Sequence, residues 1–193
     1  SRFFFFFCPM GGYGWGNVQE QELIDAVHTA LYEGVTFFDT AETYGLGQSE
    51  ITLGKALGNK RKDVVISDKF GVRAMKGQPT VYDNSRDYII KACEGSLKRL
   101  GSDYIDVYTI HYRDGKTPLS DVVETLEHLK KQGKIRYFAL SNIGEDDKKE
   151  LAELKDKFVS FQDEYSLACR KNEKIMLDLS EKYDLTPLTW GSL

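Results

Sequence analysis

Short apolar runs alternate with amphipathic stretches along most of the chain. Runs of this length, rich in valine, isoleucine and phenylalanine, are typical of buried strands, and the stretches between them carry apolar residues at helical spacing. The pattern predicts seven strands, at residues 11–16, 35–38, 64–66, 104–110, 135–140, 158–161 and 186–190. Six helices are predicted between them.

Helix starts and ends are marked by the usual signals. Ser49 and Ser85 are predicted to cap the second and third helices. Thr117 and Pro118 open the fourth, because proline is tolerated in a first turn. The stretch at residues 72–84, before the third helix, is polar and is expected to be a loop.

Strands that alternate with helices imply a parallel sheet with right-handed crossovers. Two folds remain, a doubly wound sheet and an eight-stranded barrel. Polar residues follow the strands on one side, and Gly11 to Gly16 lack the G-x-G-x-x-G spacing of a dinucleotide-binding turn. We therefore expect a (β/α)8 TIM barrel in the α/β class, truncated after its seventh strand. It would form one domain over residues 1–193, with an irregular segment at 1–10.

Five consecutive phenylalanines, Phe3 to Phe7, stand near the start of the chain. An exposed run of this kind would be a sticky apolar surface. It is interpreted either as one strand of an N-terminal hairpin or as an anomaly of the determined sequence.

Composition restricts the partners and the compartment. The chain has 193 residues, 41% hydrophobic and 29% charged, with a net charge of -4. No apolar run is long enough to span a bilayer, and lysines and arginines are scattered among acids, which argues against membrane and nucleic-acid partners. Cys8, Cys93 and Cys169 are far apart and form no CxxC pair. We expect a reducing, cytoplasmic environment and no metal site.

Four polar residues carry the candidate chemistry. Asp39, Lys69 and His111 follow apolar runs, and Tyr44 comes five residues after Asp39. A single Asp–Tyr pair is more typical of a structural aspartate beside a packing tyrosine, but barrel active sites combine several strand ends. Lys69 would lower the pKa of the Tyr44 phenol, and Asp39 would hold Lys69 by an ion pair. Tyr44 could then act as a general acid, with His111 orienting a carbonyl oxygen.

A second group of polar residues follows the later strands. Ser141, Asn142 and Gln162 offer hydroxyl and amide groups that suit another amide, and Trp190 offers a flat aromatic face. Together these groups would fit a ring that bears a carboxamide, which describes nicotinamide.

The stretches FFDTAETYG, VVISDKFG, SLKRLGSDYIDVYTIH, GKIRYFALSN, FQDEYSL and PLTWGSL occur in this order. In them the chain resembles the aldo-keto reductase superfamily from about Gly11 to Leu193. The resemblance implies a barrel oxidoreductase that reduces a small-molecule aldehyde or ketone with NADPH, or alternatively NADH. It also implies a set of site residues. Asp39, Tyr44, Lys69 and His111 would be catalytic, and Asp39, Ser141, Asn142, Gln162 and Trp190 would contact the cofactor.

The family normally continues beyond the seventh strand into segments that supply most phosphate contacts, and these segments are absent from the sequence. We expect either a piece of a longer chain or a protein that has lost part of its cofactor site. Two functional classes stay open: a carbonyl reductase, and a regulatory or binding module like the aldo-keto-reductase-like subunits of potassium channels. Nothing in the sequence fixes the substrate or the oligomeric state.

Overall fold

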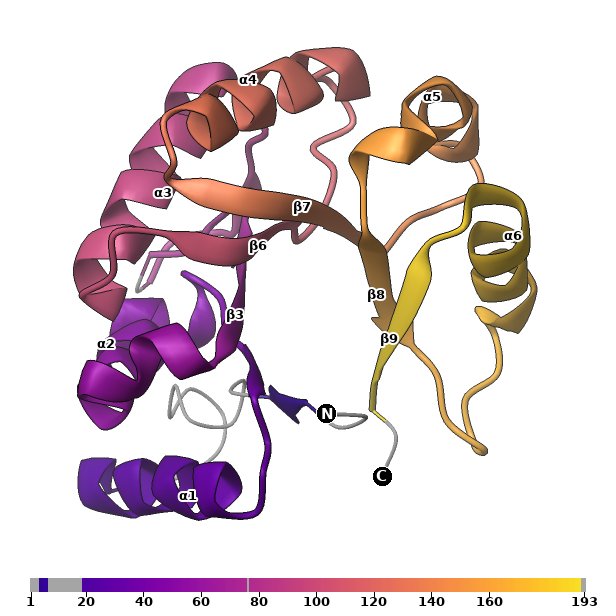
Figure 1. Cartoon of the computed structure of the whole chain (residues 1–193). Helices are drawn as coiled ribbons and strands as arrows, with labels where there is room; N and C mark the ends of the chain where they lie inside the picture. Colours follow the sequence, from indigo (N-terminus) through magenta and orange to yellow (C-terminus); the bar gives the residue numbers. More distant parts are fainter. Residues whose placement is uncertain (1–3, 7–18, 76, 192–193) are drawn as a thin grey trace.

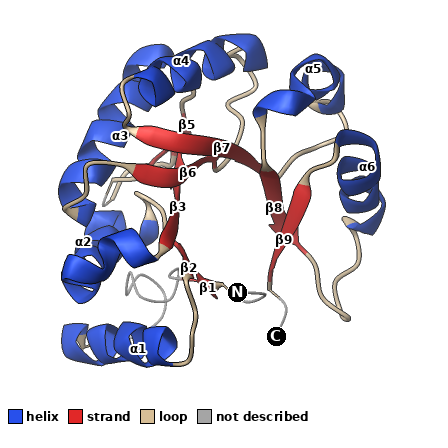
Figure 2. Ribbon diagram, viewed as in Figure 1, coloured by secondary structure: helices blue, strands red, loops and turns tan. Residues whose placement is uncertain are grey.

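The computed structural model describes residues 4–6, 19–75 and 77–191. Its main feature is a parallel sheet whose seven strands follow one another in chain order (Figures 1 and 2). These strands are β1 (Phe5–Phe6), β2 (Phe37–Asp39), β3 (Val65–Phe70), β6 (Ile105–Ile110), β7 (Ile135–Ser141), β8 (Ser160–Glu164) and β9 (Thr186–Trp190).

Helices connect the strands and lie along the outer side of the curled sheet (Figure 1). They are α1 (Glu20–Tyr32), α2 (Gln48–Leu57), α3 (Arg86–Leu100), α4 (Leu119–Lys131), α5 (Lys148–Leu154) and α6 (Glu173–Tyr183). Short 3-10 turns are η2 (Tyr44–Gly47), η3 (Gly58–Asp63) and η4 (Lys155–Lys157). A doubly wound sheet would reverse its strand order and carry helices on both faces, so this arrangement is an open half-barrel. The predicted alternation of strands and helices is confirmed.

The apolar stripes of the helices form the core against the sheet. In α4, Leu119, Val122, Leu126 and Leu129 recur at helical spacing and are all buried. Every residue of β6 is buried, because the helices cover one face of the strand and the barrel interior the other. The helical spacing of apolar residues in the sequence therefore identifies the face of α4 that packs against the sheet.

The first strand differs from its prediction. Phe5 and Phe6 pair in parallel with Phe38 and Asp39 of β2, so these two residues form a strand within the segment expected to be irregular. The rest of the hairpin interpretation lies outside the described residues. The Phe5 and Phe38 rings lie 6.1 Å apart. The predicted strand at residues 11–16 lies outside the described residues.

The stretch expected to be a polar loop contains a small antiparallel pair. The pair consists of β4 (Val72–Arg73) and β5 (Val81–Tyr82), which follow β3 and are called the flap below. Each strand has two residues, too few for an alternating pattern to be visible in the sequence.

The predicted caps are wrong in part. Ser49 lies inside α2, where its hydroxyl is 2.8 Å from that of Thr40, and Gly47 occupies the cap position with φ of 92°. A side chain at Gly47 would collide with Arg99, because an added Cβ would lie 2.6 Å from its Cδ. Ser85 does precede α3, but its side chain makes no capping hydrogen bond.

Candidate active site

Consecutive strands bring the predicted polar residues to one end of the half-barrel. Asp39 is the last residue of β2, Lys69 lies near the end of β3, and His111 follows β6. Asp39 and Lys69 are almost completely buried, although both are ionisable. Buried charges are tolerated only when they are paired and hydrogen-bonded, so their partners decide the chemistry.

The Lys69 ammonium is surrounded by three oxygens. It forms an ion pair with Asp39, and it donates to the Thr40 carbonyl and contacts the Tyr44 hydroxyl, each at 3.2 Å. An ammonium has three donors, so this set satisfies it. The structure thus joins Asp39, Lys69 and Tyr44 in one chain of contacts.

The Asp39 carboxylate has a second polar partner. Gln162 of β8 donates from Nε2 to Asp39 Oδ2 at 3.1 Å. Burial raises the pKa of Asp39 above its ordinary value, while Lys69, Ser67 and Gln162 each lower it. Gln162 therefore helps to hold Asp39, a contact that its predicted role beside a carboxamide did not include.

Tyr44 begins the η2 turn, in which Gly45 and Leu46 adopt left-handed backbone angles of φ 59° and 56°. Its ring packs edge-on against Phe6 and His111, with centroids 5.7 and 5.9 Å away. Aromatic packing on two sides and the Lys69 contact fix the direction of the phenol.

His111 is neutral at physiological pH. Burial and the nearby Lys69 ammonium lower its pKa to about 3. Its Nδ1 atom is buried and has no hydrogen-bond partner among the described residues. A neutral imidazole carries one N–H, which is enough to orient an oxygen acceptor.

Asn142 sits beside His111 at the end of β7. Its Nδ2 donates to the His111 carbonyl at 2.9 Å and to Ser141 Oγ at 3.0 Å. Its backbone is left-handed, with φ of 54°, a conformation that asparagine tolerates better than most residues. This geometry places Ser141 and Asn142 next to the histidine.

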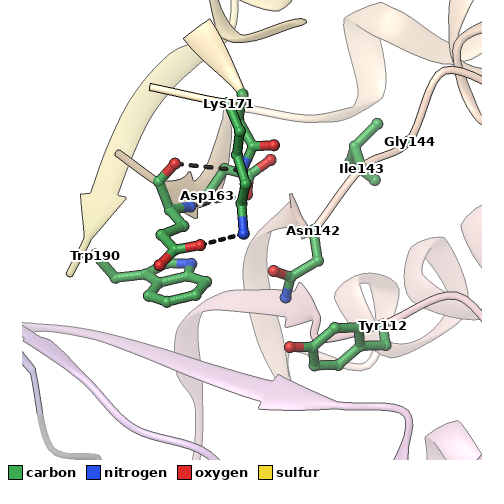
Figure 3. Close-up of a pocket in the computed structure, with 9 residues that line it drawn as sticks. Tyr112, Asn142, Ile143, Gly144, Asp163, Lys171 and Trp190 are labelled. Carbon is green, nitrogen blue, oxygen red and sulfur yellow. Dashed lines mark hydrogen bonds and ion pairs between the residues drawn. The ribbon is translucent and has the colours of Figure 1, made fainter. Parts of the chain in front are cut away.

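A pocket of about 300 Å³ opens beside this group. Asn142 and Tyr112 lie toward one side and Trp190 toward the other (Figure 3). The nine lining residues are Tyr112, Asn142, Ile143, Gly144, Asp163, Glu164, Lys171, Asn172 and Trp190.

Only two of these lining residues, Asn142 and Trp190, are predicted site residues. Tyr112 could have been found, because it directly follows His111. Lys171 pairs with Glu164 at 2.5 Å. Glu164 ends β8, whereas Lys171 reaches the pocket from the segment after β8, where the sequence carries no recognisable signal.

Two further properties concern metals and membranes. Among the described residues, no group of three or more histidine, cysteine, aspartate or glutamate side chains could hold a metal ion. Within the same part of the chain, no helix is both long and apolar enough to cross a bilayer.

A sequence model of the Aldo/keto reductase family matches residues 10–193. Aldo-keto reductase YhdN of Bacillus subtilis (strain 168) is 35% identical over 192 residues, which are 95% of this chain and 56% of that protein. Probable aldo-keto reductase 1 of Glycine max is 39% identical over 131 residues, or 67% of this chain and 38% of that protein.

Solved structures of aldo-keto reductases are also similar to this chain. The glycerol dehydrogenase AKR11B4 of Gluconobacter oxydans superposes with a TM-score of 0.88 at 30% identity, covering 99% of this chain and 59% of that one. An aldo-keto reductase of Klebsiella pneumoniae in complex with NADPH gives 0.77 at 30% identity, covering 89% and 58%. The chain thus spans somewhat more than half the length of these two solved structures.

Proposed function

The chain belongs to the aldo/keto reductase family, and from this premise we propose that it is an oxidoreductase that reduces an aldehyde or ketone with NADPH. The observation that carries the proposal is the contact of one buried ammonium, that of Lys69, with both the Asp39 carboxylate and the Tyr44 hydroxyl. Such an arrangement prepares a phenol to lose its proton, because a neighbouring cation favours the phenolate.

In this reaction Tyr44 donates its hydroxyl proton to the substrate oxygen as that oxygen gains negative charge. The Lys69 ammonium stabilises the phenolate that remains, and Asp39 keeps the ammonium in place. The neutral His111 donates its one N–H to the same oxygen and fixes its direction. The phenol is reprotonated from solvent after the alcohol leaves.

The residues around the pocket fit a nicotinamide. Asn142 presents an amide beside Ser141, and the pocket between Asn142 and Trp190 combines polar groups with a flat aromatic face. Ser141, Asn142 and Gln162 would hold the carboxamide, Asp39 would adjoin it, and Trp190 would stack on the ring. When bound, the cofactor supplies the hydride. We name NADPH rather than NADH as the cofactor because a related aldo-keto reductase was solved in complex with NADPH.

The test is Tyr44→Phe, which removes the proton donor and keeps the ring. The rate of NADPH oxidation with a panel of aldehydes should fall by about a hundred- to ten-thousand-fold, the range of general acid catalysis. NADPH affinity, measured by fluorescence titration, should stay nearly unchanged. Tyr32→Phe is the matched control, because the Tyr32 side chain is exposed on α1.

A Tyr44→Phe variant with the wild-type rate would remove Tyr44 from the mechanism. Tight NADPH binding by the wild type without turnover of any aldehyde or ketone would contradict the reductase and favour the regulatory module.

A further inference from the structure

The loop that carries Tyr44 is attached to the outer helices through Glu42. The Tyr88 hydroxyl on α3 donates to Glu42 Oε1 at 2.9 Å. The Glu42 backbone N–H donates to the carbonyl of Lys69 at 3.4 Å. Glu42 therefore connects α3 with the strand residue that contacts Tyr44, and it lies two positions before Tyr44 in the chain.

The surroundings of Glu42 contain more acids than bases. Glu50 is completely buried and accepts hydrogen bonds from Arg99 Nε at 2.6 Å and from Arg99 Nη2 at 3.1 Å. Asp68 is also completely buried, and its Oδ2 has no hydrogen-bond partner among the described residues. Three carboxyl groups therefore face one guanidinium, which already pairs with Glu50. All three cannot be ionised at low cost.

Burial and the neighbouring Glu50 raise the pKa of Glu42, while Tyr88, Arg99 and the Val72 backbone lower it, and the net pKa is about 7. The group therefore changes its charge near neutral pH. The charged and titratable groups around it are Glu50 on α2, Tyr88 and Arg99 on α3, Asp68 on β3, Tyr108 on β6 and, beyond Tyr88, Arg73 of β4 and Asp83 just after β5.

We propose that Glu42 is a proton-sensitive positioning residue for Tyr44: its neutral carboxyl holds the loop against α3, and its ionisation weakens that hold. The proposal rests on the proposed function, because Tyr44 is the proton donor whose position matters.

The coupling follows from the contacts. A neutral Glu42 accepts the Tyr88 hydrogen bond without adding a second negative charge beside Glu50. An ionised Glu42 accepts a stronger hydrogen bond from Tyr88, but burial and repulsion from Glu50 outweigh this gain, since the net pKa of Glu42 is raised. The ionised group therefore gains hydration by moving toward solvent. Because its backbone is bonded to the Lys69 carbonyl, this movement disturbs the contact between Lys69 and Tyr44.

The kinetic test compares wild type with Glu42→Gln, which is uncharged at every pH and keeps an acceptor for Tyr88. Wild-type kcat should fall by about tenfold between pH 6 and pH 8, as expected when activity follows one protonation state of a group that titrates near 7. Glu42→Gln should keep its rate at pH 6 over most of this interval, with KM for NADPH unchanged.

Glu94→Gln is the control, since Glu94 is an exposed carboxylate on α3, the helix that carries Tyr88, and it pairs with Lys134. Its pH profile should match that of the wild type. Equal profiles for wild type and Glu42→Gln would overturn the proposal.

A second variant tests the direction of the effect. Tyr88→Phe removes a hydrogen bond that lowers the pKa of Glu42, so the midpoint of the kinetic transition should move to higher pH. A midpoint that stays in place or moves to lower pH would contradict the role of the Tyr88–Glu42 contact.

A readout without turnover separates this proposal from the proposed function. The Glu42 carboxyl carbon is followed by 13C NMR across pH, its signal being assigned by its loss in Glu42→Gln, and the Tyr44 ring signals are followed with it. The experiment uses the purified protein with any natural continuation of the chain included.

We expect the Tyr44 signals to shift with the Glu42 midpoint. If they do so in a protein without turnover, the proposed function fails and the coupling stands. If turnover is present and the Tyr44 signals do not change across the Glu42 titration, the proposed coupling between Glu42 and Tyr44 is wrong.

Discussion

Asp68 and Lys69 are neighbours on β3, and they illustrate two ways to keep an ionisable group inside a protein. Successive side chains of a strand point to opposite faces, so Lys69 enters the barrel while Asp68 faces the helices. Both are almost completely buried. Lys69 meets a carboxylate and two further oxygens, whereas Asp68 lies near Glu42 and Glu50.

The difference is one of charge balance. Inside the barrel, one cation meets one carboxylate, so both groups can stay charged where the proposed reaction needs them. Outside, the acids outnumber the single guanidinium of Arg99, and burial with the nearby Glu50 raises the pKa of Asp68 well above its ordinary range. A buried site thus either pairs its charges or neutralises them by binding protons.

Removing the Lys69 ammonium inside the barrel should change stability more than any other substitution considered. Lys69→Met leaves Asp39 buried without its ion-pair partner, which should lower the free energy of unfolding by about 3–5 kcal/mol in urea titrations. Carbonyl reduction should also lose rate, and its pH profile should change in shape, because the phenol no longer has a cation beside it.

Lys131→Met, at an exposed position on α4, is the control and should be nearly silent. The double variant Asp39→Asn with Lys69→Met should recover part of the lost stability, because no charge is then left unpaired. Wild-type stability in Lys69→Met would show that the pair is not needed for folding.

Much of the fold could be predicted because its signals are local. The stripe of α4 and the apolar run of β6 each reveal their own burial. For β1, the phenylalanine run allowed a strand, but identical residues show no alternation, so its bounds and its parallel pairing with β2 could not be predicted. Ser49 resembled a cap, but Gly47 takes that place because only a glycine fits against Arg99.

In the candidate site, too, residues with local sequence signals could be predicted, and residues defined by distant contacts could not. Asp39, Lys69 and His111 could be proposed because each follows an apolar run at the end of its own strand, and the ends of parallel strands meet at one side of a barrel. Their roles stay predictions. Glu42 could not be recognised, since Tyr88 and Arg99 of α3, two of the groups that change its pKa, lie far away in the sequence. Glu50 of α2 is nearer in the chain, but only the fold shows that its charge acts on Glu42.

The outer cluster should make stability depend on pH. The pKa of Glu42 is raised from 4.5 to about 7, so the folded state binds more protons than the unfolded state between these values. Its contribution is fully present below pH 4.5 and is lost as pH rises through 7. Wild type should therefore lose roughly 2–3 kcal/mol of unfolding free energy from this group between pH 5 and pH 8.

Urea titrations across this interval check the prediction, with Glu42→Gln as the reference that lacks the titrating group. The difference in unfolding free energy between the two proteins should change across the interval in favour of the variant at pH 8. A constant difference would mean that Glu42 has an ordinary pKa.

Substitution of Asp68, the neighbour of Lys69 on β3, should change the unfolding free energy least. Burial and the nearby Glu50 raise the pKa of its carboxyl well above the ordinary value, so its environment favours the neutral form. Asp68→Asn is neutral at every pH and nearly isosteric, and it keeps the oxygen that accepts the Lys69 backbone N–H at 2.9 Å. The unfolding free energy at pH 6 should change by less than about 1 kcal/mol, because the replaced atom, Oδ2, makes no hydrogen bond among the described residues that the substitution would break. A loss as large as that of Lys69→Met would show that Asp68 is charged and paired, and the contrast between the two faces of β3 would fail.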